Sequence, residues 1–425
     1  MERKISLFFT KWKKDLIRKP LVVYGPRQIG KTFTVLEFGK NEYKNVVYFN
    51  ADNNKRLLDI FKQEKSPDKI IVNLSILSGE TILPNDTLIV FDNLNSIDIV
   101  KGIKLFGGGN NPYHIIAITS RRENLNEFKG VELQFKSMYE MDFEEFLWAR
   151  GEKQLADIIR ESFIKRRTCA FHQVALDLFY DYLRIGGLPE IVKAYLDGYS
   201  DSQIKALKQK TLDAYIKEIA LSSNLIDIPR GIEVLSSVSF QLRKENKKFQ
   251  YGLIGYGRRA KEYESSINYL VNNQIVARSY KIRNIKSPLS SCREEESFKL
   301  YMLDDGLLYS MLNVTKKEFE TDENIRETLY ENHIAKTLVE SGYSLYYYQS
   351  QGKAEVNFVI QNRMGEIIPL EITTKLMSKA KSLSVLMKKF TVKEGYRITE
   401  NNFSTKKDIR YLPIYAIFCL NDSKI

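Results

Sequence analysis

Short apolar runs alternate with amphipathic helical segments over the first third of the chain. The run Leu21–Tyr24 precedes a helical pattern from Thr32 to Lys40, and the alternation then repeats. Apolar runs of about four to eight residues between helical segments are typical of buried parallel strands. Residues 1–140 are therefore predicted to form an α/β domain, with helices on both faces of a parallel sheet. The further predicted strands are Asn45–Asp52, Leu88–Asp92, His114–Ser120 and Val131–Phe135.

Helical patterns replace this alternation between Asp142 and Ser223, interrupted by the turn Ile185–Glu190. Residues 141–225 are predicted to form a helical lid domain beside the sheet. Two more helix-like segments and an extended run, Ile275–Tyr280, follow. Helices followed by strands favour a winged-helix-like domain over residues 226–283.

The last third again mixes helices and strands, which predicts a second α/β domain over residues 284–425. Helices are predicted for Asn324–Glu340 and Met377–Phe390. The predicted strands are Leu300–Asp304, Ser344–Gln349, Glu355–Ile360, Ile367–Thr373 and Tyr411–Leu420.

Composition adds a bias toward anionic partners. The chain has 425 residues, too many for one hydrophobic core, and its formal net charge is +12. This charge indicates nucleic acid first, and then an acidic protein or a membrane surface. A solvated lysine-rich surface explains the same charge equally well.

The few cysteines and histidines exclude several kinds of site. Cys169, Cys292 and Cys419 are far apart, so they form neither a disulfide framework nor a zinc knuckle. The three histidines are isolated in sequence, which argues against histidine-based metal catalysis. No segment has the length and apolar character of a membrane span, and Leu7–Phe9 is too short for the core of a signal peptide. We expect a cytoplasmic protein without a membrane partner.

One stretch carries the clearest chemistry: Tyr24–Thr32 contains the pattern G-x-x-x-x-G-K-T between a predicted strand and a predicted helix. Its two glycines allow the backbone to direct N–H groups at phosphate oxygens, and Lys31 adds a positive charge. The Thr32 hydroxyl can hold Mg²⁺, and a helix N-terminus favours an anion. An ordinary glycine-containing loop is the alternative, which the flanking elements disfavour. The predicted cofactor-binding residues are Gly25, Pro26, Arg27, Gln28, Ile29, Gly30, Lys31, Thr32 and Phe33.

Two later strands end in residues that would complete a nucleotide site. Leu88–Asp92 has the Walker B pattern, in which Asp92 reaches Mg²⁺ through water. Thr119 or Ser120, at the end of the next strand, is a candidate sensor of the γ-phosphate. The carboxyl ends of parallel strands meet at one edge of a sheet, so these residues should converge. The predicted catalytic residues are Lys31, Asp92 and Ser120, and the predicted metal ligands are Thr32 and Asp92.

Asn93 departs from the usual pattern for hydrolysis. Active ATPases of this class generally carry a glutamate just after the Walker B aspartate, where it polarises the attacking water. An amide can orient water but cannot accept its proton. We therefore expect ATP binding with slow or absent turnover.

Two features of the C-terminal half bear on a partner. The segment from Arg243 to Lys261 is basic with interleaved aromatic residues, which suits contacts to a phosphate backbone as well as it suits a solvated surface. Further along, Glu331 on a helix, Asn357 on a strand and Glu371-Ile372-Thr373 on the next strand are spaced like the core of a restriction-type nuclease.

The chain resembles the prokaryotic AAA-type ATP-binding proteins that carry a C-terminal nuclease-like domain of the PD-(D/E)XK type. The resemblance implies binding of ATP and Mg²⁺ at the residues named above, and a C-terminal domain with the restriction-endonuclease fold. The matching segments run almost end to end: Gly25–Thr32, Leu88–Asp92, Met141–Leu147, Gly186–Glu190, Leu300–Leu308, Glu331-Asn332 and Ala354–Val359.

At the nuclease-like site the chain departs from that family. The family usually has an aspartate at the position of Asn357 and a lysine at the position of Thr373. A metal-dependent nuclease needs carboxylates for Mg²⁺ and a lysine for water, so we expect an inactive site. Glu355 and Lys375 are the residues that could stand in, because residues two apart on a strand share a face.

The sequence therefore predicts an ATP-Mg²⁺-binding protein that acts as a nucleotide-dependent switch, with DNA as the expected partner. The alternative is a signalling or scaffold module whose basic surfaces meet a protein partner, with nucleotide in a structural role. Salt-sensitive binding of duplex DNA distinguishes the two.

Overall fold

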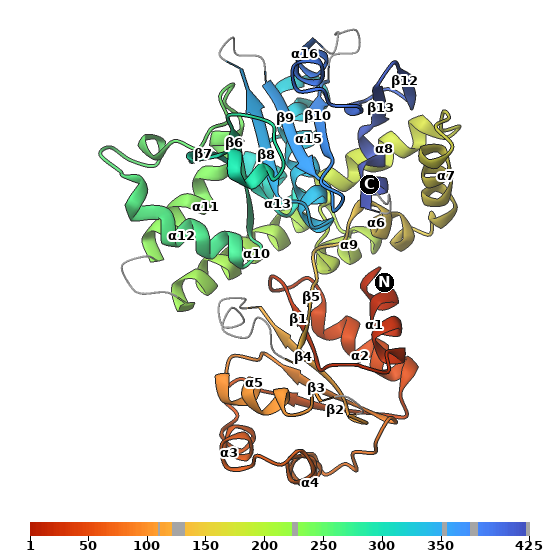
Figure 1. Ribbon diagram of the computed structural model, residues 1–425, viewed down its shortest axis with the longest axis vertical. Coiled ribbons are helices and arrows are strands. Elements are labelled where there is room, and N and C mark those ends of the chain that lie inside the picture. Colours follow the sequence, from red (N-terminus) through yellow and green to blue (C-terminus); the bar gives the residue numbers. More distant parts are fainter. Residues whose placement is uncertain (109–110, 121–131, 223–227, 351–354, 375–380, 422–425) are drawn as a thin grey trace. The chain divides into compact units, whose positions relative to one another are not determined.

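Two β-sheets organise the chain, one in an N-terminal unit, Met1–Tyr139, and one in a C-terminal unit, Glu140–Ile425. The computed structural model describes residues 1–108, 111–120, 132–222, 228–350, 355–374 and 381–421 (Figure 1). A few sequence predictions lie outside these residues: the start of a strand at Val131, the domain boundary at 225/226, the stand-in Lys375 and the start of a helix at Met377.

The N-terminal unit contains the predicted parallel α/β domain. Its strands are β1 (Leu21–Tyr24), β2 (Asn45–Asn50), β3 (Thr87–Asp92), β4 (His114–Thr119) and β5 (Gln134–Ser137). All four pairings in the order β2-β3-β4-β1-β5 are parallel, which confirms the prediction. The helices are α1 (Ile5–Lys14), α2 (Lys31–Glu42), α3 (Lys55–Gln63), α4 (Pro67–Ser78) and α5 (Ile97–Lys104).

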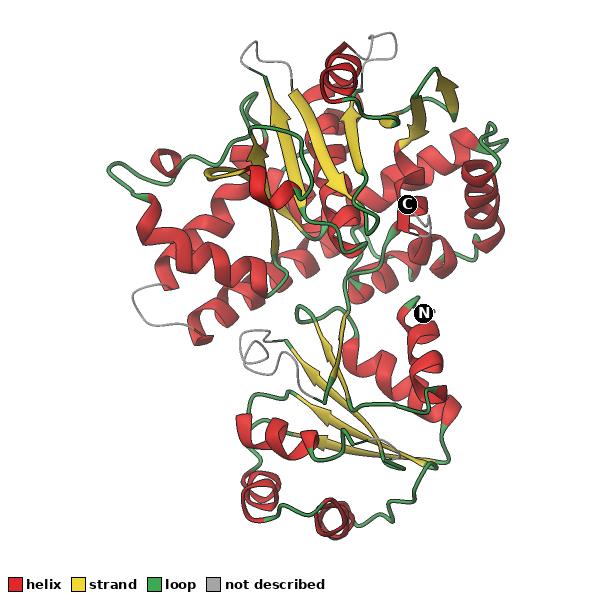
Figure 2. Ribbon diagram, viewed as in Figure 1, coloured by secondary structure: helices red, strands yellow, loops and turns green. Residues whose placement is uncertain are grey.

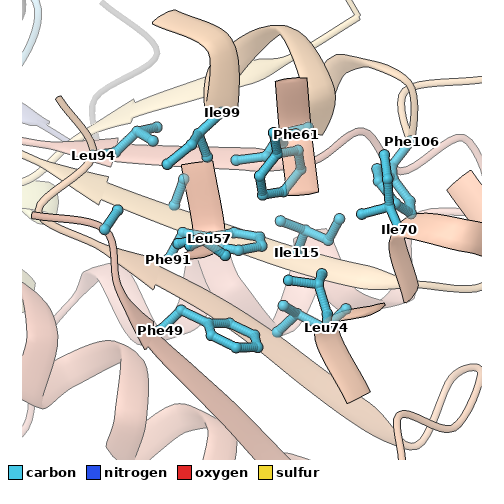
Figure 3. Packing of buried hydrophobic residues seen from close by; sticks show 14 of the residues in the cluster. Phe49, Leu57, Phe61, Ile70, Leu74, Phe91, Leu94, Ile99, Phe106 and Ile115 are labelled. Carbon is cyan, nitrogen blue, oxygen red and sulfur yellow. The ribbon is translucent and has the colours of Figure 1, made fainter. Parts of the chain in front are cut away.

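Aromatic and branched side chains fill the space between this sheet and helices α3, α4 and α5 (Figure 3). Phe91 on β3 stacks on Phe49 of β2, with ring centroids 5.5 Å apart, and meets Phe61 of α3 edge-on at 5.6 Å. Every residue of β3 is buried, as expected for a central parallel strand covered on both faces. Burial of such side chains is the main favourable term in folding, at about 25 cal/mol per Å² of apolar surface.

The C-terminal unit begins with helices, as the sequence predicts from Asp142 onward. The Asp142 carboxylate accepts the Glu145 N–H, and Glu145 reaches back to the Asp142 N–H, so a capping box starts the first helix. That residues 141–225 form a lid over bound nucleotide remains a prediction. The helices are α6 (Phe143–Ala149), α7 (Lys153–Ile164), α8 (His172–Ile185), α9 (Pro189–Leu196), α10 (Asp201–Ser222), α11 (Ile228–Leu242) and α12 (Ala260–Asn272).

A mixed sheet of eight strands follows, in the order β12-β13-β11-β10-β9-β8-β6-β7 (Figure 2). Its strands are β6 (Val276–Ile282), β7 (Arg293–Met302), β8 (Leu345–Gln349), β9 (Glu355–Gln361), β10 (Ile367–Ile372), β11 (Gly395–Thr399), β12 (Ser404–Lys406) and β13 (Ile409–Pro413). The further α-helices of the described residues are α13 (Asp305–Leu312), α14 (Lys316–Thr321), α15 (Glu323–Glu340) and α16 (Lys381–Phe390), and the described 3₁₀ helices include η2 (Tyr251–Leu253), η3 (Leu289–Cys292) and η4 (Ile414–Asn421).

The extended run Ile275–Tyr280, expected to belong to a separate winged-helix-like domain, lies mostly in β6 and is part of this large sheet. Strand β6 pairs antiparallel with β7 and parallel with β8, so a continuous ladder crosses the predicted boundary at 283/284. An independent wing is therefore not formed by β6 and β7. The reason is nonlocal, because the pairing partner β8 lies more than sixty residues further along the chain.

The prediction of a last strand over Tyr411–Leu420 is wrong for most of that segment. Only Tyr411–Pro413 of the predicted run Tyr411–Leu420 lies in a strand, and the rest forms the 3₁₀ helix η4. Pro413 has no N–H to donate to a sheet, which favours an end to the strand there. The residues after it are buried throughout, so their apolar run carries no periodicity that separates a strand from a helix.

Among the described residues, no helix has the length and apolar character that a membrane crossing requires.

Candidate nucleotide-binding site

The loop between β1 and α2 has the backbone conformation of an anion-binding nest. Gln28 and Gly30 adopt positive φ angles of 65° and 84°, and α2 begins directly after Gly30. Alternation of left- and right-handed residues turns successive N–H groups toward one point, and the start of a helix adds further free N–H groups. The geometry therefore suits phosphate oxygens.

The glycine at the start of this loop is required by space. Gly25 does not have a positive φ, but a Cβ there would lie 2.2 Å from the Met138 carbonyl oxygen and 2.7 Å from Cδ1 of Ile29. Its N–H donates to the Thr119 carbonyl at 3.3 Å, which attaches the loop to the end of β4. Any larger residue would displace the loop from the sheet.

A buried arginine near the N-terminus holds the other side of the loop. Arg3 donates from Nη1 to the Ile29 carbonyl at 2.9 Å and from Nη2 to the Tyr139 carbonyl at 2.6 Å. Such charge-assisted bonds are roughly twice as strong as neutral ones. Arg3 is therefore a positioning residue for this loop, which we call the P-loop after its G-x-x-x-x-G-K-T pattern. The sequence pattern did not indicate this role of Arg3.

Lys31 is folded back into the loop. Its side chain is 7% exposed, and its ammonium donates to the carbonyl oxygens of Gly25 at 2.8 Å and Pro26 at 2.5 Å. Phosphate oxygens would compete with these carbonyls for the same N–H groups. Because a phosphate oxygen carries negative charge and a carbonyl oxygen does not, the exchange turns bonds from a charged donor to neutral acceptors into ion pairs, which favours an anionic ligand.

Thr32 and Asp92, the two predicted metal ligands, are in direct contact. The Thr32 hydroxyl donates to Oδ2 of Asp92 at 2.7 Å, and the Tyr48 hydroxyl donates to the same oxygen at 3.0 Å. Burial, followed by the charge of Asp92, raises the pKa of Tyr48 to about 12, so its hydroxyl stays protonated at neutral pH. Tyr48 belongs to the site, and sequence reasoning missed it.

Asn93 has the backbone strain that often accompanies a functional position. Its φ is 55°, a region that asparagine tolerates better than most residues. The Asn93 N–H donates to Oδ1 of Asp92 at 2.8 Å, and its side-chain amide donates to Oδ1 of Asn50 at 3.2 Å. The side chain is thus oriented by a second amide, and neither group can accept a proton from water.

Lys31, Thr32, Asp92 and Asn93 line one cavity of about 220 Å³ at the carboxyl edge of the sheet. Ser120, the predicted sensor, is half-buried at this edge, and Thr119 is buried beside it. Of the predicted contacts, Gly25, Pro26 and Ile29 belong to the loop without lining the cavity. The lining residues are Arg27, Gln28, Gly30, Lys31, Thr32, Phe33, Asp92, Asn93, Ile118, Thr119 and Ser120.

A second charged cluster lies in the C-terminal unit, around Glu331 of α15. Its carboxylate accepts the Lys247 ammonium at 2.7 Å, the Lys299 ammonium at 2.9 Å and the Tyr301 hydroxyl at 2.5 Å. The Asn357 amide donates to it at 3.2 Å. Burial alone would raise the pKa of Glu331, but the two lysines and the tyrosine outweigh burial and hold the pKa below its usual range.

The other residues of the expected nuclease site are engaged elsewhere. Glu355 pairs with Lys299, and Glu371 has the Arg397 Nε 3.4 Å away. Burial raises the pKa of Glu371, which Arg397 only partly opposes. The Thr373 N–H donates to the Ile398 carbonyl at 3.1 Å. In the described part of the chain, no group of three or more His, Cys, Asp or Glu side chains is arranged to hold a metal ion.

Comparison with known proteins assigns part of the chain. Residues 17–147 match a family model described as an AAA domain. Residues 176–318 and 326–417 match two domains of unknown function, DUF8612 and DUF4143. No curated protein matches the chain. The N-terminal unit is therefore an AAA-type P-loop domain of the nucleotide-binding class, as its motif and its parallel sheet also indicate.

Several solved structures are similar to the chain at low identity. A Walker-type ATPase of Pyrococcus abyssi is 13% identical, with a TM-score of 0.43, over 74% of this chain and 96% of that one. The Orc1 protein of Aeropyrum pernix in complex with DNA is 12% identical, with a TM-score of 0.29, over 74% of this chain and 93% of that one. At such TM-scores the likeness does not identify a function.

The Glu331 cluster predicts a strong energetic coupling. Lys299→Met leaves a buried carboxylate with one lysine in place of two, and we expect a loss of about 3 kcal/mol in the free energy of unfolding. Glu331→Gln in the Lys299→Met background should cost much less than it costs in the wild type. Chemical denaturation of the four variants measures this, with exposed Lys286→Met as the control. Additive effects would show that the pair is not coupled.

Proposed function

We propose that the chain binds ATP with Mg²⁺ at the P-loop cavity and uses the bound nucleotide as a conformational switch with slow hydrolysis. The observation that carries this proposal is the convergence of Lys31, Thr32 and Asp92 on one cavity. The nest from Gln28 to Gly30 would hold the phosphates, and Lys31 would neutralise the β- and γ-phosphates. Ser120 would sense the γ-phosphate from the end of β4.

The residues present fit a magnesium ion. The Thr32 hydroxyl and the Asp92 carboxylate are hard oxygen donors 2.7 Å apart. Magnesium is usually held by one or two carboxylates together with substrate phosphates, so a single aspartate suffices. The ion would neutralise charge on the phosphate oxygens. Tyr48 would keep the carboxylate of Asp92 in place through its hydrogen bond.

Slow hydrolysis follows from the side chains around Asn93. Its neighbour Asn50 also carries an amide, so this pair can orient water without removing a proton. Transition-state stabilisation by Lys31 would still act, since it needs no base. The chain would therefore stay in its ATP-bound form long enough to act as a switch.

Nucleotide binding is tested by thermal stability. ATP with Mg²⁺ binds only the folded state, so at about 100 times the Kd it should stabilise the chain by about 2.7 kcal/mol and raise Tm. Lys31→Ala should abolish the rise, whereas Lys40→Ala, at the exposed end of the same helix, should keep it. The same rise in Lys31→Ala and the wild type would mean that ATP binds elsewhere.

Hydrolysis is tested at Asn93. Asn93→Glu adds a base beside the water site and should raise the rate of phosphate release roughly 10²–10⁴-fold. Asn93→Gln has nearly the same shape without a base, and should leave the rate near that of the wild type. A wild-type rate already within the usual range of about 1–10³ s⁻¹, or equal rates in the two variants, would contradict the role given to Asn93.

We infer that the C-terminal unit contacts the backbone of DNA without cutting it. Arg243, Lys244, Arg259 and Lys261 are exposed, and Tyr256 between them is fully exposed. Such a surface suits contacts to phosphates that carry no sequence information. Lys247 of the same segment is buried on Glu331 and does not belong to this surface.

The absence of cutting follows from the charges around Glu331. Two ammonium groups already neutralise this carboxylate and Glu355, so a metal ion there would meet positive charge. Asn357 adds an amide where a second carboxylate would be needed. The restriction-nuclease likeness of this unit is thus proposed as a retained fold with an inactive site.

Duplex binding distinguishes this role from a protein-binding scaffold. Fluorescence anisotropy with a labelled duplex should show affinity that falls steeply with added salt, and no cleavage product with Mg²⁺ or Mn²⁺. Combined Arg243→Ala, Lys244→Ala and Arg259→Ala should lower the salt slope by about 2.7, whereas the same charge loss at the exposed Lys62, Lys69 and Lys101 should leave it unchanged. No binding of the duplex by the wild type would favour the protein-partner alternative.

A further inference from the structure

A second cavity, of about 290 Å³, lies within the C-terminal unit. Its walls come from the end of α8, the first half of α10, and the segment from the end of α13 to the start of α14. This site is separate from the P-loop and from the Glu331 cluster, since it shares no residue with either. Its size suits a small molecule and not a polymer.

The lining of this cavity is strongly basic. It contains one arginine and three lysines but only one carboxylate, Asp201. Arg184 pairs with Asp201 and, at 3.1 Å, with Asp181, so these three form their own network. Lys205 donates to Oδ1 of Asn313, a neutral group, at 2.8 Å. Because both carboxylates of this network pair with Arg184, the remaining positive charge of the cavity is carried by its lysines.

Lys208 is the unusual member of this set. It is only 4% exposed, and its ammonium donates to the Arg184 carbonyl and lies 5.6 Å from the centre of the Tyr309 ring. Among the described residues, no carboxylate forms an ion pair with it. Burial lowers the pKa of Lys208 to about 8, although Asp304 partly opposes this. A buried cation in this condition gains from any anion that reaches it.

Tyr309 provides a second, independent indication. Its side chain is 8% exposed, and its hydroxyl is buried without a hydrogen-bond partner among the described residues. An unsatisfied buried hydroxyl is destabilising, and a ligand with an acceptor oxygen would offset this cost after a small side-chain movement. The ring, with Ile204 and Val314, also gives the basic cavity an apolar wall.

We propose that this cavity binds a small organic phosphate ester, with its phosphate at Lys208 and Lys205 and its organic part against Tyr309. A phosphate monoester carries a charge near −2 at neutral pH, which balances two lysines better than the single negative charge of a carboxylate. The apolar wall favours an ester over inorganic phosphate. The binding would stabilise the helices α10 and α13 that hold these residues, and it does not depend on the function of the P-loop.

The test uses the full chain with Lys31→Ala, so that the P-loop does not compete for phosphate. Calorimetric titration with phenyl phosphate at pH 7.5 should show one site. Adding Lys208→Met should weaken binding by about tenfold or more, since a charge-assisted hydrogen bond is lost. Lys217→Met on the exposed face of the same helix is the matched control and should change nothing.

Lys205→Met keeps the test decisive if Lys208→Met fails to fold. Lys205 is exposed, so its loss leaves the core intact, and it should weaken binding several-fold. Absence of binding by phenyl phosphate at millimolar concentration would overturn the proposal. Equal affinities in the two lysine variants and the parent, or equal binding of phenol, would also overturn it, because the phosphate would then play no part.

The dependence on pH gives a further readout. The groups that face Lys208 are Arg184, Asp201, Asp304 and Tyr309, and of these the tyrosine, whose pKa burial raises, stays neutral up to pH 9. The ester stays doubly charged from pH 7 to 9, so Lys208 is the group that titrates. Affinity should therefore fall as pH rises through about 8, and this fall should vanish in Lys208→Met. A fall of the same size in Lys208→Met would contradict the assignment.

Discussion

The parallel pairing of β1 with β4, and of β4 with β3, is the constraint on which the nucleotide site depends. In a parallel ladder all carboxyl ends face one edge, so the loop after β1, Asp92 at the end of β3 and Ser120 after β4 meet there without being neighbours in sequence. The hydrogen bond from Gly25 N–H to the Thr119 carbonyl extends this pairing into the loop itself. The chemistry of the site is thus an outcome of strand order.

Three buried lysines of the described residues have different partners, and each arrangement has a different consequence. Lys31 is satisfied by backbone carbonyls that a phosphate can replace. Lys299 lies between Glu331 and Glu355, and these carboxylates raise its pKa above the usual range against the effect of burial. Lys208 donates to one carbonyl and has no carboxylate partner among the residues that the structure describes, and burial lowers its pKa. The partner of a buried lysine therefore decides whether it is a ligand site or a structural ion pair.

The same reasoning explains why the Glu331 cluster and the P-loop differ in how well a ligand can reach their charged groups. The P-loop keeps its charged groups at the wall of a cavity, where a ligand can reach them. Glu331 has its carboxylate fully occupied by Lys247, Lys299, Tyr301 and Asn357. Removal of one residue from such a network leaves a buried charge without its partner. The lysines are therefore held in place and cannot easily be replaced by a metal ion.

Local spacing in the sequence was enough for the P-loop, for the strand before it and for the helix after it, because a nest and a helix start are built from consecutive residues. The runs that became β2, β3 and β4 were also predicted, since buried parallel strands carry continuous apolar sequence. The position of Asp92 followed from its place at the end of such a run.

Tertiary structure alone decided the rest. Lys247 looks like its basic neighbours in sequence, yet it is buried because it pairs with Glu331, which lies 84 residues further along the chain. Arg3, Tyr48 and Lys299 were missed for the same reason, since their partners lie on other elements. Pairing with β8 likewise placed β6 in the large sheet, and burial left η4 without a periodicity that would predict its structure. Both depend on contacts between distant residues, which a local pattern of polarity does not contain.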